Sequence, residues 1–225
     1  EKASLDKSRL VYKQVEPADW SRVKGDIMAM EEMFTPDLRM SEEDMAKTFL
    51  NPECLIIGIE YEGKTIGYVA GWPLIKYRYF LPVSDNDDEV DKGTTMYLES
   101  RVVVKKYQKI GLGTKLREEF GKLAKEKGYI YVTSLQKKGI ANKIGARVIA
   151  VYPHWGGLGN AYEYSRTYLS NSVKETSDPG GIDLNQINVN RTGNAIKMNF
   201  DPAQLNELLQ GGFEGFMPVI MKIKH

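Results

Sequence analysis

Apolar residues recur at the spacing of an amphipathic helix in three long segments of the chain. The first segment follows Asp19, and its apolar face consists of Trp20, Val23, Ile27, Met30 and Phe34. The second is opened by Ser41, a favourable N-cap residue, and is ended by Asn51-Pro52. The third begins at Leu112 and ends at Gly128, and its apolar stripe consists of Leu112, Leu116, Phe120 and Leu123.

Short alternating or β-branched runs account for most of the remaining positions. The clearest case is a hairpin, because residues 54–74 form two apolar runs around the Glu62-Gly63 turn. Further strands are predicted over residues 8–16, 94–104, 129–134, 146–152 and 161–169, with a short helix that reaches about Lys143. This order of elements predicts an α/β (α+β) fold with a largely antiparallel sheet.

The character of the sequence changes at Ser170. NSVKETSDPGG is typical of a linker, and the rest predicts a strand (AIKMNF), a helix (PAQLNELLQ) and a strand (FMPVIMKIK). We therefore expect a domain over residues 1–169, followed by a C-terminal β-α-β extension over residues 170–225. A dimer contact is one role that we consider for this extension.

The composition of the chain argues against some classes of binding partner. Thirty-one basic and 30 acidic side chains leave a formal charge of +1, which argues against nucleic acid or an anionic membrane as the partner. The single cysteine, Cys54, excludes an internal disulfide framework and fits a reducing compartment. Since no apolar run approaches 18 residues, we expect a cytoplasmic protein.

The stretch YQKIGLGTKL, residues 107–116, joins a β-branched run to the third helix. Its Q-x-x-G-x-G pattern consists of Gln108, Gly111 and Gly113. Glycines let the backbone turn tightly and approach a ligand, and the unpaired N–H groups that begin a helix favour phosphate. A turn that needs two glycines for steric reasons alone is the alternative. The Walker and Rossmann glycine patterns are both absent.

In its context, YLESRVVVKKYQKIGLGTKL resembles the acetyl-CoA-binding segment of the GNAT N-acetyltransferases, and the order of elements over about residues 8–169 is similar to theirs. The resemblance implies a GNAT fold, with a mostly antiparallel mixed sheet flanked by helices. It also implies transfer of an acetyl group from acetyl-CoA to a primary amine, by direct attack in a ternary complex and without a metal. The residues that it implies for binding coenzyme A are Arg101, Val102, Val103, Gln108, Lys109, Ile110, Gly111, Leu112, Gly113, Thr114 and Ser134.

Glu99 is the candidate general base. It lies in the strand TTMYLESRVVV, where desolvation by apolar neighbours raises the pKa of a carboxylate towards neutrality. YLE before the glycine loop is similar to the spermidine/spermine-type branch of the family, which implies that Glu99 accepts the proton. In the alternative interpretation, Glu99 points to solvent and has no catalytic role.

The proton donor is less well defined. The family's pattern N-x-x-A-x-x-x-Y-x-K-x-G-F aligns with SLQKKGIANKIGARVI so that Ala141 stands at the tyrosine position. Tyr152, Tyr162 and Tyr164 are substitutes by topology, and we take Tyr152 as the prediction. Two alternatives stay open: the thiolate leaves unassisted, or the protein binds acyl-CoA without turnover and acts as a scaffold. The acceptor also stays open among a polyamine, an amino acid, an aminoglycoside-like drug and a protein lysine.

The remaining candidates favour structure over chemistry. His154 has only His225 as a companion, so we expect no metal site and a packing role. Cys54 is expected to be a small buried residue, and GGLGN a turn between strands. The acidic run SDNDDEVD suits a solvated loop better than a site for a cationic acceptor.

Overall fold

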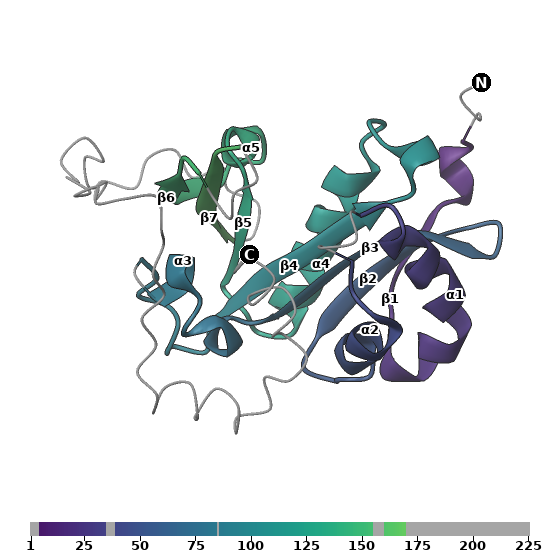
Figure 1. Cartoon of the computed structure of the whole chain (residues 1–225), viewed down its shortest axis with the longest axis horizontal. Coiled ribbons are helices and arrows are strands. Elements are labelled where there is room, and N and C mark those ends of the chain that lie inside the picture. The colour runs from purple at the N-terminus through teal and green to yellow at the C-terminus, as the bar shows by residue number, and fades with distance from the viewer. Residues whose placement is uncertain (1–4, 35–38, 85, 155–159, 170–225) are drawn as a thin grey trace. The chain divides into compact units, whose positions relative to one another are not determined.

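The computed structural model describes residues 5–34, 39–84, 86–154 and 160–169 of the chain (Figure 1). The predictions for the extension 170–225, and most of the GGLGN segment, lie outside the described residues. The boundary predicted at residue 170 therefore stays a prediction.

Seven strands form one mixed sheet in the order β1-β2-β3-β4-β5-β7-β6. Their bounds are β1 Val11–Gln14, β2 Leu55–Tyr61, β3 Lys64–Pro73, β4 Thr95–Val103, β5 Tyr131–Lys137, β6 Arg147–Tyr152 and β7 Tyr162–Tyr168. Neighbouring strands are antiparallel except β4 and β5, which are parallel. The predicted fold class, a mostly antiparallel mixed sheet with flanking helices, is confirmed.

The helices are α1 Trp20–Glu31, α2 Glu42–Phe49, α3 Leu81–Ser84, α4 Leu112–Glu126 and α5 Ile140–Lys143. The helices α1, α2, α4 and α5 lie near the predicted residues, whereas α3 was not predicted. Ser41 caps α2 as predicted, since its Oγ accepts the N–H of Asp44 at 3.1 Å. The predicted hairpin turn has positive φ at both Glu62 (52°) and Gly63 (77°), which suits the twist of antiparallel strands.

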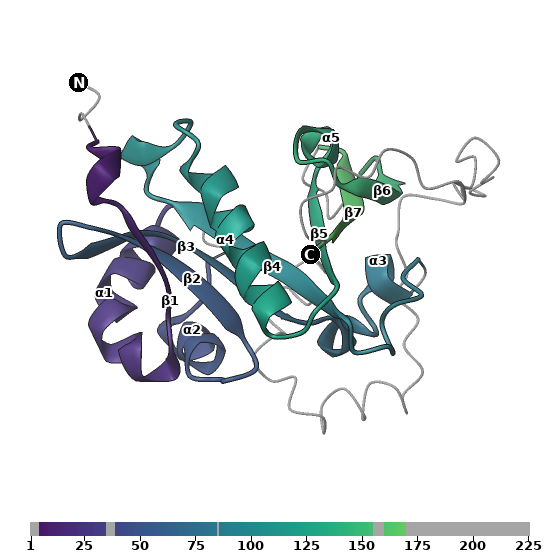
Figure 2. The same cartoon turned by 180° about the vertical axis from the view of Figure 1, so that it is seen from behind.

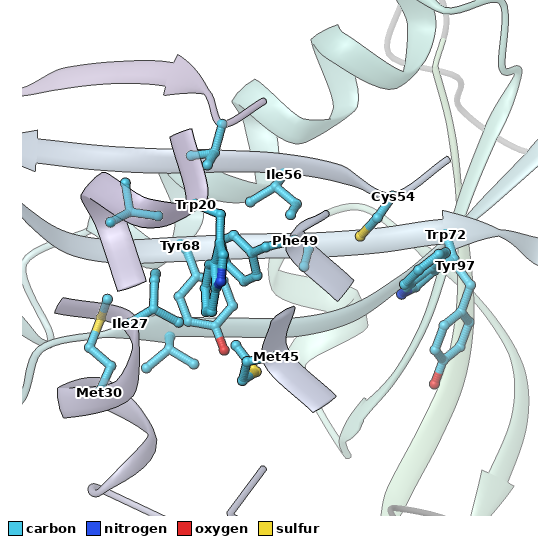
Figure 3. Close-up of a cluster of buried hydrophobic side chains, with 14 of the residues drawn as sticks. Trp20, Ile27, Met30, Met45, Phe49, Cys54, Ile56, Tyr68, Trp72 and Tyr97 are labelled. Carbon is cyan, nitrogen blue, oxygen red and sulfur yellow. The ribbon is translucent and has the colours of Figure 1, made fainter. Parts of the chain in front are cut away.

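Two apolar clusters lie on opposite faces of the sheet. The helices α1 and α2 cover one face, whereas α4 packs on β2, β3 and β4 from the other, as Figure 2 shows from behind. On the first face, Phe49 of α2 lies between Trp20 and Tyr68, with ring centroids 5.0 and 5.6 Å away (Figure 3). On the second face, Leu116 and Phe120 of α4 are fully buried. The sheet therefore separates two layers of buried apolar side chains, one on each of its faces.

A β-bulge in β4 changes which side chains face each layer. Ala70 of β3 pairs with Ser100, but Gly71 pairs with Leu98, so Glu99 is the extra residue. Glu99 consequently lies on the face of α1 and α2, whereas Arg101, only two residues on, contacts the start of α4. Regular alternation would have put both side chains on one face.

The strands β4 and β5 part after a short ladder, and Figure 1 shows them diverging. Their paired positions are Thr95–Tyr131, Met96–Val132 and Tyr97–Thr133. Beyond these pairs β4 continues on β3 alone, and β5 continues on β7 alone. One backbone edge of β4 is therefore left unpaired by β5 at residues 101–103, which the resemblance implied for binding coenzyme A.

The acidic run is not a solvated loop at its centre, so that interpretation is wrong for two of its residues. Asp87 is buried and binds both the hydroxyl of Tyr164 and the guanidinium of Arg166. Glu89 is also buried, and it accepts from Lys92 and Thr94 at 2.7 and 3.0 Å. Buried carboxylates need such partners because desolvation penalises an unpaired charge. The segment therefore fastens the chain before β4 to β7.

Candidate functional site

The loop between β4 and α4 adopts the conformation that its glycines were expected to permit. Gly111 has φ 94° and precedes the first turn of α4, while Lys109 takes a positive φ of 65°. Gln108 anchors the loop to the strand, because its Nε2 donates to the carbonyl of Val103 at 2.8 Å. Within the described residues, no backbone N–H from Lys109 to Thr114 donates to a carbonyl or side-chain acceptor. The loop can therefore offer these N–H groups to an anion.

Glu99 is partly buried and does not point to solvent, contrary to the alternative interpretation. Its Oε2 accepts a hydrogen bond from Nε1 of Trp72 at 3.1 Å. Burial raises the pKa of Glu99 to about 7, although the Tyr77 hydroxyl and the Trp72 N–H act in the opposite direction. Near neutral pH, such a carboxylate can both accept and release a proton.

Aromatic side chains surround Glu99, and no motif in the sequence predicted them. Tyr77 and Tyr97 pack in a tilted arrangement with ring centroids 4.1 Å apart, and Phe80 meets the Tyr97 ring edge-on at 5.9 Å. Burial raises the pKa of Tyr97, the Glu99 charge adds to this rise, and the N–H of Leu135 in β5 opposes it. The Tyr97 hydroxyl thus lies where β4 and β5 part. The only signal in the sequence was the density of aromatic residues around the run before β4.

Cys54 lies on the same face of the sheet as Glu99 and has the packing role that was predicted for it. It is buried, and burial followed by the Glu99 charge raises the pKa of its thiol. A neutral thiol is a poor nucleophile, since the thiolate is the reactive form.

The tyrosine candidates differ in their surroundings. The hydroxyl of Tyr152 accepts from Nδ2 of Asn86 at 2.8 Å, and the ring packs against the apolar cluster that contains Trp72 and Tyr97. Tyr164 is bound to Asp87 in the interior, which indicates a structural role. Ala141, at the family's tyrosine position, is fully buried, and its N–H donates to Glu163 at 2.6 Å.

The predicted cofactor residues of β4 and β5 divide between the two faces. Val102 joins the cluster of α1 and α2, and Val103 joins the cluster of α4. Arg101 donates from Nη1 to the carbonyl of Gly113 at 3.2 Å. Ser134, just past the β4–β5 ladder, accepts from Nη1 of Arg117 at 3.2 Å. Arg117 was missed, because a basic residue beside the apolar stripe of a helix is common and does not by itself indicate a site.

The profile of the acetyltransferase (GNAT) family matches residues 26–156, more than half of the chain. The chain belongs to the GNAT acetyltransferase family. None of the curated protein sequences matches it. The matched region contains the whole loop, Glu99 and both strands that part beside them.

Several solved structures share the GNAT fold at low sequence identity. An aminoglycoside 6'-acetyltransferase type Ii is 15% identical with a TM-score of 0.56, and covers 72% of this chain and 99% of its own. A polyamine N-acetyltransferase of Drosophila melanogaster is 11% identical with a TM-score of 0.54 (71% and 99% covered). An aminoglycoside 6'-N-acetyltransferase complexed with coenzyme A is 13% identical with a TM-score of 0.51 (72% and 99% covered). At these identities the likeness shows the fold alone.

The described part of this GNAT domain contains neither a candidate metal site nor a candidate membrane-spanning helix. The described residues contain no group of three or more His, Cys, Asp or Glu side chains that could hold a metal ion. In that same part of the chain, no helix combines the length and the apolar character that crossing a bilayer requires.

Proposed function

We propose that this chain is an N-acetyltransferase that moves an acetyl group from acetyl-CoA to a primary amine, by direct attack within a ternary complex. The observation that carries the proposal is the placement of Glu99. Its carboxylate has a pKa of about 7, and it lies on β4 between the point where β5 departs and the loop that begins α4.

The donor is proposed to bind along the free edge of β4, with its pyrophosphate at the N–H groups of Lys109 to Thr114. These groups have no acceptor among the described residues, and the helix dipole adds a favourable potential for anions. The unpaired edge of β4 can receive the amides of the pantetheine arm as an added strand would. When bound, acetyl-CoA supplies the thioester carbon that the amine attacks.

Glu99 is proposed to remove one proton from the ammonium form of the acceptor, directly or through one water. The freed lone pair forms the new N–C bond, and the nitrogen then releases its second proton to water. The C–S bond breaks, so the products are a neutral amide and a thiolate. A cationic acceptor also suits the site, since the ionised carboxylate of Glu99 attracts an ammonium group. The acceptor is therefore proposed to be a small amine or a lysine side chain that is protonated in solution.

Tyr152 is proposed to protonate the leaving thiolate. An amide donor from Asn86 stabilises the phenolate that this step leaves behind. Tyr162, the neighbour of Tyr152 across the β6–β7 ladder, is the second candidate.

A second function, binding acyl-CoA without turnover, is favoured by one observation. Ala141 is fully buried and held by Glu163, so a tyrosine cannot simply be restored at the family's position. Release of free thiol from acetyl-CoA, measured against a panel of polyamines, aminoglycosides, amino acids and lysine peptides, separates the two functions. Tight binding of coenzyme A with no thiol release from any amine would overturn the enzymatic proposal.

A further inference from the structure

Two arginines on the α4 side of the sheet have no acidic partner within the described residues. Arg101 of β4 is partly buried, and Arg117 of α4 is only 9% exposed. Their hydrogen bonds go to neutral groups: Arg101 to the carbonyl of Gly113, and Arg117 to the hydroxyls of Ser134 and Thr167 at 3.2 and 3.1 Å. No carboxylate in that part of the chain forms an ion pair with either guanidinium.

Another arginine at similar depth shows what compensation looks like in this protein. The side chain of Arg166 is largely buried, and its guanidinium forms ion pairs with the carboxylates of both Asp87 and Asp88. A buried cation without such a partner carries a desolvation cost of several kcal/mol. Arg101 and Arg117 bear that cost. Burial is the larger cause that lowers the pKa of Arg117 to about 10, and repulsion by the charge of Arg101 is the second cause.

The position of the pair indicates which ligand relieves this cost. Arg101 touches Gly113, the last glycine of the loop whose N–H groups are open. Arg117 reaches from the second turn of α4 to Ser134, the first residue of β5 beyond the β4–β5 ladder. The guanidinium of Arg101 therefore lies beside the anion-binding loop. That of Arg117 lies beside Ser134 of β5 and Thr167 of β7, where β4 and β5 part.

We propose that Arg101 and Arg117 form a side-chain anion site that binds the pyrophosphate of the acyl-CoA donor together with the loop. This inference rests on the proposed function, since it assigns a further part of the donor site. Guanidinium groups suit this role because their planar donors match phosphate oxygens and stay charged at neutral pH. The site makes the protein selective for donors that carry phosphate over short thioesters that do not.

The test is equilibrium binding by the full chain and by R101M and R117M, with four probes: coenzyme A, dephospho-coenzyme A, pantetheine and inorganic pyrophosphate. Each variant is expected to bind coenzyme A and dephospho-coenzyme A about 10- to 100-fold more weakly, as loss of a charged hydrogen bond predicts. Affinity for pantetheine should be unchanged, and pyrophosphate binding should be lost. Lys122→Met is the control, because Lys122 is an exposed cation on the same helix.

A thermal melt of the ligand-free variants separates this role from a structural one. Methionine keeps the length and apolar stem of arginine, so removal of an uncompensated buried cation should leave the melting temperature equal or higher. A purely structural arginine predicts a lower one. Wild-type affinity for coenzyme A in R117M, or an equal loss for pantetheine and coenzyme A, would overturn the inference.

The remaining outcomes are also distinguishable. Loss of only the coenzyme A signal, with dephospho-coenzyme A unaffected, assigns the arginines to the 3'-phosphate and overturns the pyrophosphate assignment. If R101M and R117M lose binding as expected but the wild-type protein acetylates no amine, this inference is supported and the proposed function is refuted. A wild-type protein that binds neither coenzyme A nor pyrophosphate refutes the inference.

Discussion

The indole N–H of Trp72 donates to the carboxylate of Glu99 across the β3–β4 bulge at 3.1 Å. This contact opposes the effect of burial, which disfavours the ionised carboxylate and brings its pKa to about 7. The two effects together keep Glu99 in the range where a general base works best at neutral pH.

Glu99→Gln should lower kcat/KM by about 10²- to 10⁴-fold with the best amine, because the amide cannot accept the proton. In the wild type, kcat/KM should rise with pH through about 7 as Glu99 ionises, and this limb should vanish in the variant. Initial rates of thiol release between pH 5.5 and 9 measure both effects. Glu43→Gln serves as control, since the Glu43 side chain is 78% exposed and should leave rate and profile unchanged. A wild-type rate in E99Q would remove Glu99 from the mechanism.

Trp72→Phe should move the acid limb of the pH profile upwards. Loss of a donor worth about 1 kcal/mol raises the pKa of Glu99 by about one unit. Tyr77→Phe should shift the limb in the same direction, because Tyr77 also supports the ionised form. The measurement is again kcat/KM against pH. A limb that stays at its wild-type pH in both variants would show that the limb does not report Glu99.

Glu99 should also make stability depend on pH. Its pKa is raised in the folded state from 4.5 to about 7, so the folded protein binds more protons than the unfolded chain in this window. Stability therefore falls as pH rises from about 4.5 to about 7. At pH 8, the free energy of unfolding of E99Q should exceed that of the wild type by up to about 3 kcal/mol, so E99Q should unfold at a higher urea concentration. At pH 4.5 the two proteins should differ little in stability. Equal stabilities at pH 8 would contradict the raised pKa.

Tyr152→Phe should lower kcat by about 10²-fold if its hydroxyl protonates the leaving thiolate. The ring is retained, so packing against the neighbouring cluster should survive. Tyr168→Phe is the matched control, because Tyr168 is an exposed β7 residue. An unchanged kcat would favour unassisted departure of the thiolate or donation by another phenol.

Gly71→Ala should destabilise the fold by about 1–3 kcal/mol. A Cβ at this position would lie 2.5 Å from the carbonyl oxygen of Tyr97 and from the ring of Phe120, so backbone and ring must both move. Gly25→Ala in α1 is the matched opposite, since a Cβ there meets nothing within 4 Å. It should stabilise the helix by about 0.5–1 kcal/mol. Chemical denaturation of the two variants gives the comparison, and equal effects would contradict it.

Local patterns were sufficient to predict most elements and the loop. The helix that begins at Leu112 and the hairpin at Glu62-Gly63 follow from periodicity and from residues that tolerate positive φ. The open N–H groups after Gln108 follow from the same glycines. These features depend on neighbours within a few positions in the chain, which is why they can be predicted from the sequence.

The features that the sequence did not reveal depend on distant residues. The bulge that turns Glu99 and Arg101 to opposite faces is a property of the β3–β4 pairing. Burial of Asp87 depends on Tyr164 and Arg166, which lie more than 75 positions away. A run of carboxylates has the composition of a solvated loop, and only tertiary contacts reverse that interpretation.

The single extra residue in β4 also has a kinetic consequence. Because it sends Glu99 towards α1 and α2 and Arg101 towards α4, the acceptor proposed at Glu99 and the donor proposed at Arg101 would approach the strand from opposite sides. Neither ligand then has to pass the other on entry or exit. Product- and dead-end-inhibition patterns should therefore be those of a random-order bireactant enzyme, because either ligand can bind first.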